Sequence, residues 1–212
     1  MNIKINQPAG IGDILFCLKI ARTYISQGYT VYWPVIPQYS WIKDYLEIEG
    51  LKWEDNKDCQ TVLDLQSAGR VFPEITTMDA KYKMAKMDYR DWKDYAVFKR
   101  NKEKEERLYK RVVTTEPYCL VCDNFGSPPV VLKRFVPINL VMFNINMNFI
   151  DDFTPFDWCK IIENASELRL VDTCFIYLAE KIDLKATEMY LYSRQGRFYT
   201  DHLWKKPWKY VI

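Results

Sequence analysis

The sequence predicts an α/β protein made of two halves, each built around a parallel sheet. Short apolar runs alternate with amphipathic stretches, which is the pattern of alternating strands and helices. A strand, a glycine-containing turn and a helix open the chain, and the same order recurs after Pro117. The 212 residues suffice for two small units. We expect an N-terminal unit over 1–115 and a C-terminal unit over 116–212.

The first unit is expected to begin with half of a βαβ motif. A strand over 3–5 leads into a turn with Gly10 and Gly12, and a helix opens at Asp13. Glycine lets backbone N–H groups approach a ligand closely, and the positive end of the helix points into the same space. The turn therefore predicts an anion site. A dinucleotide fingerprint is disfavoured, because Leu15 stands where its third glycine would be.

Asp13 has two interpretations at the start of this helix. An aspartate there satisfies free N–H groups as an N-cap and favours the helix dipole. It can also serve as a general base at the mouth of a cleft. The two roles are compatible, because one carboxylate oxygen can cap the helix while the other faces a substrate.

The rest of the first unit continues the alternation. Strands are expected over 30–35 and 61–65, with a helix over 41–49 between them. A strongly charged helical stretch then runs over 79–110. These elements make the first half of an open parallel sheet.

Within the charged stretch, the spacing places Tyr82, Lys86, Tyr89 and Lys93 on one helix face. A solvated helix with an aromatic seam packed on the sheet explains this pattern most simply. The second interpretation is an acceptor-binding wall, because aromatic and basic side chains suit sugars and anionic groups. Tyr82, Lys86 and Tyr89 are the candidate acceptor contacts.

The second unit is expected to repeat the order of the first. A strand over 118–122 enters a turn that carries Gly126 and Ser127. Strands over 139–145, 167–171 and 188–192 follow, in alternation with helices over 154–164, where Thr154 is the N-cap and Pro155 the first helical residue, and 172–182.

Asp13 and Asp172 stand in equivalent places in the two units, because each follows an apolar strand and begins a helix. Ligands bind at the carboxyl ends of strands in open α/β sheets. Two facing halves would therefore form a cleft with one aspartate on each side.

Composition excludes several classes of function. The net charge of +2 gives no strong field toward nucleic acid, and no apolar run reaches the ~18 residues of a membrane span. A single histidine, His202, argues against a Ser-His-Asp triad and against a multi-histidine metal site. We expect a cytoplasmic protein whose six cysteines are reduced core thiols. Cys119 and Cys122 have redox or zinc spacing but lie in an expected buried strand.

Two segments resemble the heptosyltransferase-type glycosyltransferases, whose GT-B fold consists of two Rossmann-like lobes. The first is Gly10-Ile-Gly12-Asp13-Ile-Leu15, similar to the family's segment that carries its proposed catalytic base. The second runs from Asn164 through Asp172-Thr173 to Leu-Ala at 178–179, similar to the donor-site segment. The chain departs from the family at Tyr177, where a histidine is usual, and it is shorter, as in a compact member.

The resemblance implies an inverting, metal-independent transfer from a nucleotide-sugar to a glycan or glycoconjugate acceptor. Asp13 would be the base, and the nucleotide-sugar would be a co-substrate, with no further cofactor. Asp172 would contact a hydroxyl or only cap its helix, because its charge repels phosphate. The donor-binding candidates are Gly10, Gly12, Gly126, Ser127, Lys133, Arg134, Asn164, Asp172 and Thr173.

Three alternatives remain beside this interpretation. A non-catalytic module could use the same surfaces to hold a glycan or a partner protein. A metal-dependent GT-A enzyme would normally carry Asp-x-Asp at a strand end, and this chain contains no such sequence. A nucleotide-sugar or nucleoside-phosphate enzyme on a single Rossmann sheet would have one continuous sheet and no cleft between lobes. The basic, aromatic tail over 204–210 is expected to pack across the other unit, or else to bind a partner or a membrane surface.

Overall fold

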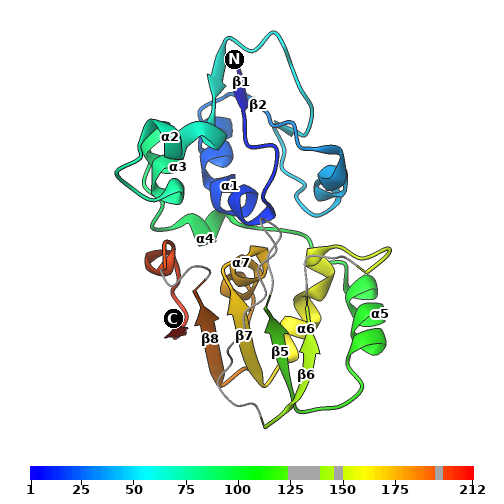
Figure 1. Ribbon diagram of the computed structural model, residues 1–212. Coiled ribbons are helices and arrows are strands. Elements are labelled where there is room, and N and C mark those ends of the chain that lie inside the picture. The colour runs from blue at the N-terminus through cyan, green and yellow to red at the C-terminus, as the bar shows by residue number, and fades with distance from the viewer. Residues whose placement is uncertain (124–138, 146–149, 194–197) are drawn as a thin grey trace. The chain divides into compact units, whose positions relative to one another are not determined.

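The computed structural model describes residues 1–123, 139–145, 150–193 and 198–212. The chain divides into two compact units, Met1–Lys99 and Arg100–Ile212, each with a parallel sheet (Figure 1). The predicted α/β class with two Rossmann-like halves is confirmed. The boundary lies before α5 (Lys102–Val112) rather than after residue 115, because this helix packs against α6 (Cys159–Asn164) of the second unit.

The sheet of the first unit has the order β3-β2-β1-β4, and every neighbouring pair is parallel. Its strands are β1 (Asn2–Ile5), β2 (Thr30–Tyr32), β3 (Leu51–Lys52) and β4 (Thr61–Leu63). The chain winds outward from β1 to β3 and then returns to the other side of β1. The strand order therefore reverses between β1 and β4, and open α/β sheets bind their ligands at such a point.

Helices of the first unit gather around α1 (Ile11–Ser26), against which α3 (Thr77–Ala85) and α4 (Trp92–Tyr95) pack (Figure 1). Most of the first three turns of α1 is buried. The expected helix over 41–49 is instead the 3₁₀ helix η1 (Pro37–Asp44). The remaining helices are η2 (Leu65–Ser67) and α2 (Ala68–Val71).

The prediction of a helical stretch over 79–110 is wrong at its centre. The helix α3 ends at Ala85, because Lys86 adopts a left-handed conformation with φ 55°. Beyond it, the Asp88 carboxylate accepts a hydrogen bond from the Arg90 backbone N–H at 2.8 Å, which favours a turn over a helix. The chain resumes as the single turn α4, and α5 begins separately at Lys102.

The sheet of the second unit has the order β6-β5-β7-β8-β9 and is also parallel throughout. Its strands are β5 (Tyr118–Cys122), β6 (Val141–Asn144), β7 (Glu167–Val171), β8 (Glu188–Tyr192) and β9 (Lys209–Val211). This is the second common order of doubly wound sheets, and it reverses between β5 and β7. The expected strands over 118–122, 167–171 and 188–192 are confirmed.

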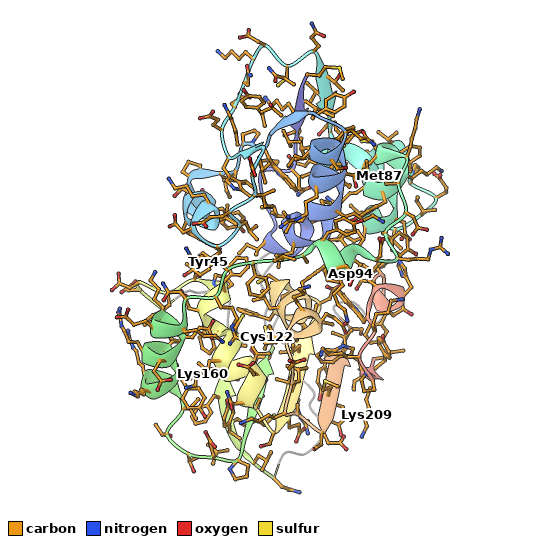
Figure 2. All side chains as sticks on the ribbon, turned by 180° about the vertical axis from the view of Figure 1, so that it is seen from behind. Tyr45, Met87, Asp94, Cys122, Lys160 and Lys209 are labelled. Atoms are coloured by element: carbon orange, nitrogen blue, oxygen red, sulfur yellow. The ribbon has the colours of Figure 1, made fainter. Side chains whose placement is uncertain are left out.

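The described helices of the second unit are η3 (Pro155–Trp158), α5, α6, α7 (Cys174–Lys181) and η4 (Asp201–Leu203). Thr154 caps η3 as predicted, in a capping box with Asp157. Lys160 extends from α6 toward α5, where its ammonium pairs with Glu106 (Figure 2). The Thr154 capping box thus marks the start of the helical segment that precedes β7, and the Lys160–Glu106 ion pair joins α6 to α5.

The C-terminal tail, for which packing across the other unit was the expectation, completes the sheet of its own unit. Its strand β9 pairs with β8 as a parallel edge strand. The Glu180 carboxylate, 1% exposed, accepts hydrogen bonds from the backbone N–H groups of Lys205 and Lys206, both at 3.1 Å. It also accepts one from the Trp208 indole at 2.8 Å. A buried anion on α7 therefore holds the tail.

All six cysteines are free thiols, and five of them are buried. Cys59 is only half-buried, so the prediction of six core thiols holds for the other five. Burial raises the pKa of the Cys119 thiol to about 12.

Among the described residues, no helix has the length and apolar character that a membrane span requires.

Candidate active site at the carboxyl edge of the first sheet

The loop that follows β1 is fixed at the point where the strand order reverses. The Asn6 backbone N–H donates to the Leu63 carbonyl at 2.9 Å, and the Asn6 carbonyl accepts from the Gln66 N–H at 3.0 Å. The Asn6 side chain donates to Asp64 Oδ1 at 2.6 Å. The ends of β1 and β4 are thus tied together before the chain turns into α1.

The other side of this loop is held by the segment that follows β2. The Trp33 indole, which is fully buried, donates to the Gln7 carbonyl at 2.9 Å. The Ile36 N–H donates to the Pro8 carbonyl at 2.9 Å, and the Gln7 amide donates to the Ala9 carbonyl at 2.5 Å. The turn before α1 is therefore anchored from both neighbouring strands.

Gly10 is the N-cap residue of α1, with φ 83°. Its carbonyl accepts the Ile14 N–H at 2.9 Å, so the helix begins at Ile11 rather than at Asp13. No side chain caps the helix. The N-cap interpretation of Asp13 is therefore wrong: Asp13 lies in the first turn, where a carboxylate still interacts favourably with the helix dipole.

The Asp13 carboxylate folds back over Gly10. A Cβ atom added to Gly10 would lie 2.3 Å from Asp13 Oδ2, far inside van der Waals contact. Gly10 is thus required twice, for its left-handed backbone and for the space above it. Gly12, the second glycine of the predicted anion site, is buried in the first turn of α1.

Lys81 of α3 supplies the partner of Asp13. Its Nζ lies 2.9 Å from Asp13 Oδ1, donates to the Leu65 carbonyl at 3.4 Å and donates to the Gln7 side-chain oxygen. The lysine side chain is 2% exposed, whereas that of Asp13 is 34% exposed. The cation of this ion pair is in the core, and the anion reaches the surface.

Sequence reasoning missed Lys81, because it lies within a strongly charged stretch. The available signal was its spacing from Met78 and Ala85, which places all three on the face that α3 buries. One turn after Asp13, Cys17 is also buried, and burial raises the pKa of its thiol to about 12. The side of α1 that faces the core beneath Asp13 is therefore lined by the neutral Cys17 thiol and by apolar side chains.

The three predicted acceptor contacts are not on one helix face. Tyr82 is 1% exposed, its ring packs edge-on against Phe16 at 4.8 Å between ring centroids, and its hydroxyl donates to the Phe16 carbonyl at 2.6 Å. Tyr82 is therefore a core residue, a correction to its predicted role. Lys86 is exposed at the end of α3, and Tyr89, beyond the helix, is partly exposed.

In the second unit, Asp172 and Thr173 follow β7, beside the point where that sheet's order reverses. Thr173, not Asp172, caps α7: its hydroxyl accepts the Phe175 N–H at 3.4 Å. The Thr173 hydroxyl oxygen also lies 3.9 Å from the sulfur of Cys122, the last residue of β5. Asp172 instead accepts a hydrogen bond from the Thr200 hydroxyl at 2.5 Å.

Asn164 lies at the opposite end of β7 from Asp172, because it precedes the strand. Its amide donates to the Lys160 carbonyl at 2.8 Å, and its oxygen accepts from Lys185 Nζ at 2.7 Å. This placement does not support one donor site containing both residues. The other donor-binding candidates, Gly126, Ser127, Lys133 and Arg134, lie outside the described residues.

Within the described ranges, no three or more His, Cys, Asp or Glu side chains are grouped so that they could hold a metal ion.

No family model matches the sequence, and no curated protein does. The crystal structure of the iron-containing dodecameric glycosyltransferase TibC from enterotoxigenic E. coli H10407 is similar, with a TM-score of 0.56 and 10% identity over 99% of this chain. The chain spans 62% of the TibC chain. At this identity the likeness concerns the fold alone, which resembles that of TibC.

Proposed function

We propose that this protein is a glycosyltransferase that moves a sugar from a nucleotide-sugar to a hydroxyl group of a glycan or glycoconjugate. The observation that carries the proposal is the Asp13 carboxylate, which is partly exposed and held in place where the strand order of the first sheet reverses. The glycosyltransferase-like fold supports the same class of reaction.

In the proposed reaction, Asp13 acts as the general base. Its carboxylate takes the proton of the acceptor hydroxyl as that oxygen forms a bond to the anomeric carbon. The bond between the anomeric carbon and the phosphate oxygen breaks, and its electron pair leaves with the nucleotide, which is a nucleoside diphosphate for UDP-, GDP- and ADP-sugars and CMP for a CMP-sugar. Attack on the face opposite the leaving group inverts the configuration of the sugar.

The departing diphosphate needs stabilisation as its negative charge grows. For the second unit we propose that the N-terminus of α7, with the N–H groups next to Thr173, binds it, since a helix N-terminus favours anions. Asp172 is better suited to a hydroxyl, because it already accepts a hydrogen bond from the Thr200 hydroxyl. Lys133 and Arg134 remain candidates for a basic contact to phosphate.

Acceptor binding is proposed for Lys86 and Tyr89, which keep exposed surface beyond the end of α3. Tyr82 is not included, because its hydroxyl is buried and donates within the core. Basic and aromatic side chains suit the hydroxyl groups and apolar ring faces of a glycan.

A thermal-shift screen against UDP-glucose, GDP-mannose, ADP-glucose and CMP-N-acetylneuraminate tests the proposal. A ligand that binds the folded state raises the melting temperature by mass action. We expect one nucleotide class to raise it and mass spectrometry to detect release of the corresponding nucleotide. Stabilisation without turnover, even with added glycan acceptors, would favour the non-catalytic module. No shift with any of the four would contradict the donor site.

A further inference from the structure

We infer that Lys81 is a positioning residue that holds the Asp13 carboxylate in the orientation needed for proton transfer. The inference rests on the proposed function and extends it to a residue outside both segments of family resemblance. Three observations support it: the acceptors around Lys81, the independent anchoring of α3, and the constraint on Asp13 from Gly10.

The first observation is that the buried ammonium has acceptors from three parts of the site. Asp13 belongs to α1, Gln7 to the loop after β1, and Leu65 to the turn after β4. A lysine ammonium has three N–H donors, which matches these three acceptors. Burial of a charge is unfavourable unless it is paired and hydrogen-bonded, so Lys81 is confined to this arrangement.

The second observation is that α3 is anchored without Lys81. Thr76 caps the helix by accepting the Asp79 N–H at 3.2 Å, and its hydroxyl donates to Asp79 Oδ2 at 2.8 Å. Tyr82 fixes the middle of the helix to α1 through the Phe16 carbonyl. A charged group at position 81 is therefore not needed to dock the helix. The Lys81 ammonium instead acts on the three groups that it contacts, which belong to Asp13, Gln7 and Leu65.

The third observation is that the Asp13 carboxylate is confined from two sides. Oδ1 faces Lys81 Nζ at 2.9 Å, and Oδ2 lies in the space that Gly10 leaves open. The exposed third of the side chain is thus presented in one orientation. Misplacement of a catalytic group by about 1 Å can reduce a rate about 100-fold, so loss of this constraint should appear in kcat.

The experiment compares Lys81→Met with Lys83→Met on the same helix. Lys83 is a matched control, because it is 49% exposed and pairs with the exposed Glu74 at 2.6 Å. Turnover of UDP-glucose, GDP-mannose, ADP-glucose and CMP-N-acetylneuraminate is measured for the wild type and both variants. For the donor that the wild type uses, we expect K81M to lower kcat about 100-fold with a KM within about threefold, because Asp13 stays present but is no longer held. K83M should match the wild type in both constants.

A double variant separates positioning from general destabilisation. If Lys81 acts only through Asp13, K81M should cause no further loss of turnover in an Asp13→Asn background, since residues that act as a unit are not additive. Should K81M fail to fold, Lys81→Gln replaces it, because the amide keeps polar contact with the Gln7 and Leu65 oxygens.

The outcomes distinguish the inference from the proposed function. A wild type that turns over none of the four donors would overturn the proposed function, and the inference with it. An active wild type with unchanged kcat in K81M, or with only its KM raised, would overturn the inference alone. An equal loss from K81M in the wild-type and Asp13→Asn backgrounds would also overturn it.

Discussion

The Asp13 carboxylate and the Lys81 ammonium meet at 2.9 Å, where the strand order of the first sheet reverses. The pair is asymmetric, because Lys81 is 2% exposed and Asp13 is 34% exposed. A buried cation and a surface anion arranged in this way leave the carboxylate accessible but fixed. This relationship is the basis of the proposed site.

Gly10→Ala should be more damaging than Gly28→Ala. Both glycines have a left-handed backbone, with φ 83° and 86°, so each substitution should cost about 1–2 kcal/mol of unfolding free energy from strain. A Cβ at Gly28 meets nothing within 4 Å, whereas at Gly10 it would collide with the Asp13 carboxylate. We expect G10A alone to lose turnover as well. Denaturant unfolding and donor turnover test this, and equal effects of the two variants would contradict the geometry.

Tyr82→Phe should affect stability and leave acceptor affinity unchanged. It removes the buried hydroxyl that donates to the Phe16 carbonyl, at a cost of about 1 kcal/mol. In a chain of this size, that corresponds to a fall of about 2–4 °C in melting temperature. Tyr89→Phe is the comparison for stability alone, because Tyr89 is partly exposed and its substitution should cost less than Y82F, while as a proposed acceptor contact it can change the KM. A raised KM for the acceptor in Y82F, at unchanged melting temperature, would instead restore Tyr82 to the acceptor site.

Glu180→Gln should release the C-terminal tail. The buried carboxylate accepts hydrogen bonds from three N–H donors of the tail, and an amide would turn its own NH₂ toward at least one of them. We expect a loss of about 2–3 kcal/mol in unfolding free energy and faster amide hydrogen exchange in β9. The control is Glu188→Gln, an exposed partner of Lys209, which should cost less than about 1 kcal/mol. Unchanged exchange in E180Q would contradict the role of Glu180 in holding the tail.

Glu163 should contribute stability that depends on pH. The Arg100 guanidinium, 2.9 Å away, lowers the pKa of the Glu163 carboxyl in the folded state. A lowered folded-state pKa stabilises the protein above the unfolded pKa of about 4.3, and this contribution is lost as pH falls through the folded value. The wild type should therefore exceed Glu163→Gln in unfolding free energy at pH 7, with the difference shrinking below about pH 4. A difference that is constant from pH 7 to pH 3 would contradict the ion pair.

Elements with strong local signals could be predicted from the sequence. The apolar runs of β7 and β8 gave the bounds that the structure has, and the Thr154-Pro155 pair marked the start of η3. The turn at Gly10 also followed from the local pattern, although the helix begins at Ile11 and not at the predicted Asp13. In each case, neighbouring residues determine the backbone conformation.

Elements that depend on distant partners could not be predicted. The two-residue strand β3 and the tail strand β9 form because neighbouring strands offer an edge. The burial of Lys81 depends on acceptors from Gln7, Asp13 and Leu65, which only the fold brings together. In the sequence, Lys81 could not be distinguished from the exposed lysines beside it, because its charge predicts exposure for all of them.

The most direct test of the central claim is the turnover of Asp13→Asn at saturating donor, with donor binding measured by thermal shift on the same protein. Asparagine keeps the shape of the side chain but cannot accept the acceptor's proton. We predict that the donor still raises the melting temperature, while kcat falls by about 10²–10⁴, the usual contribution of a general base. Turnover at the wild-type rate in the Asp13→Asn variant would contradict the assignment of Asp13 as the base.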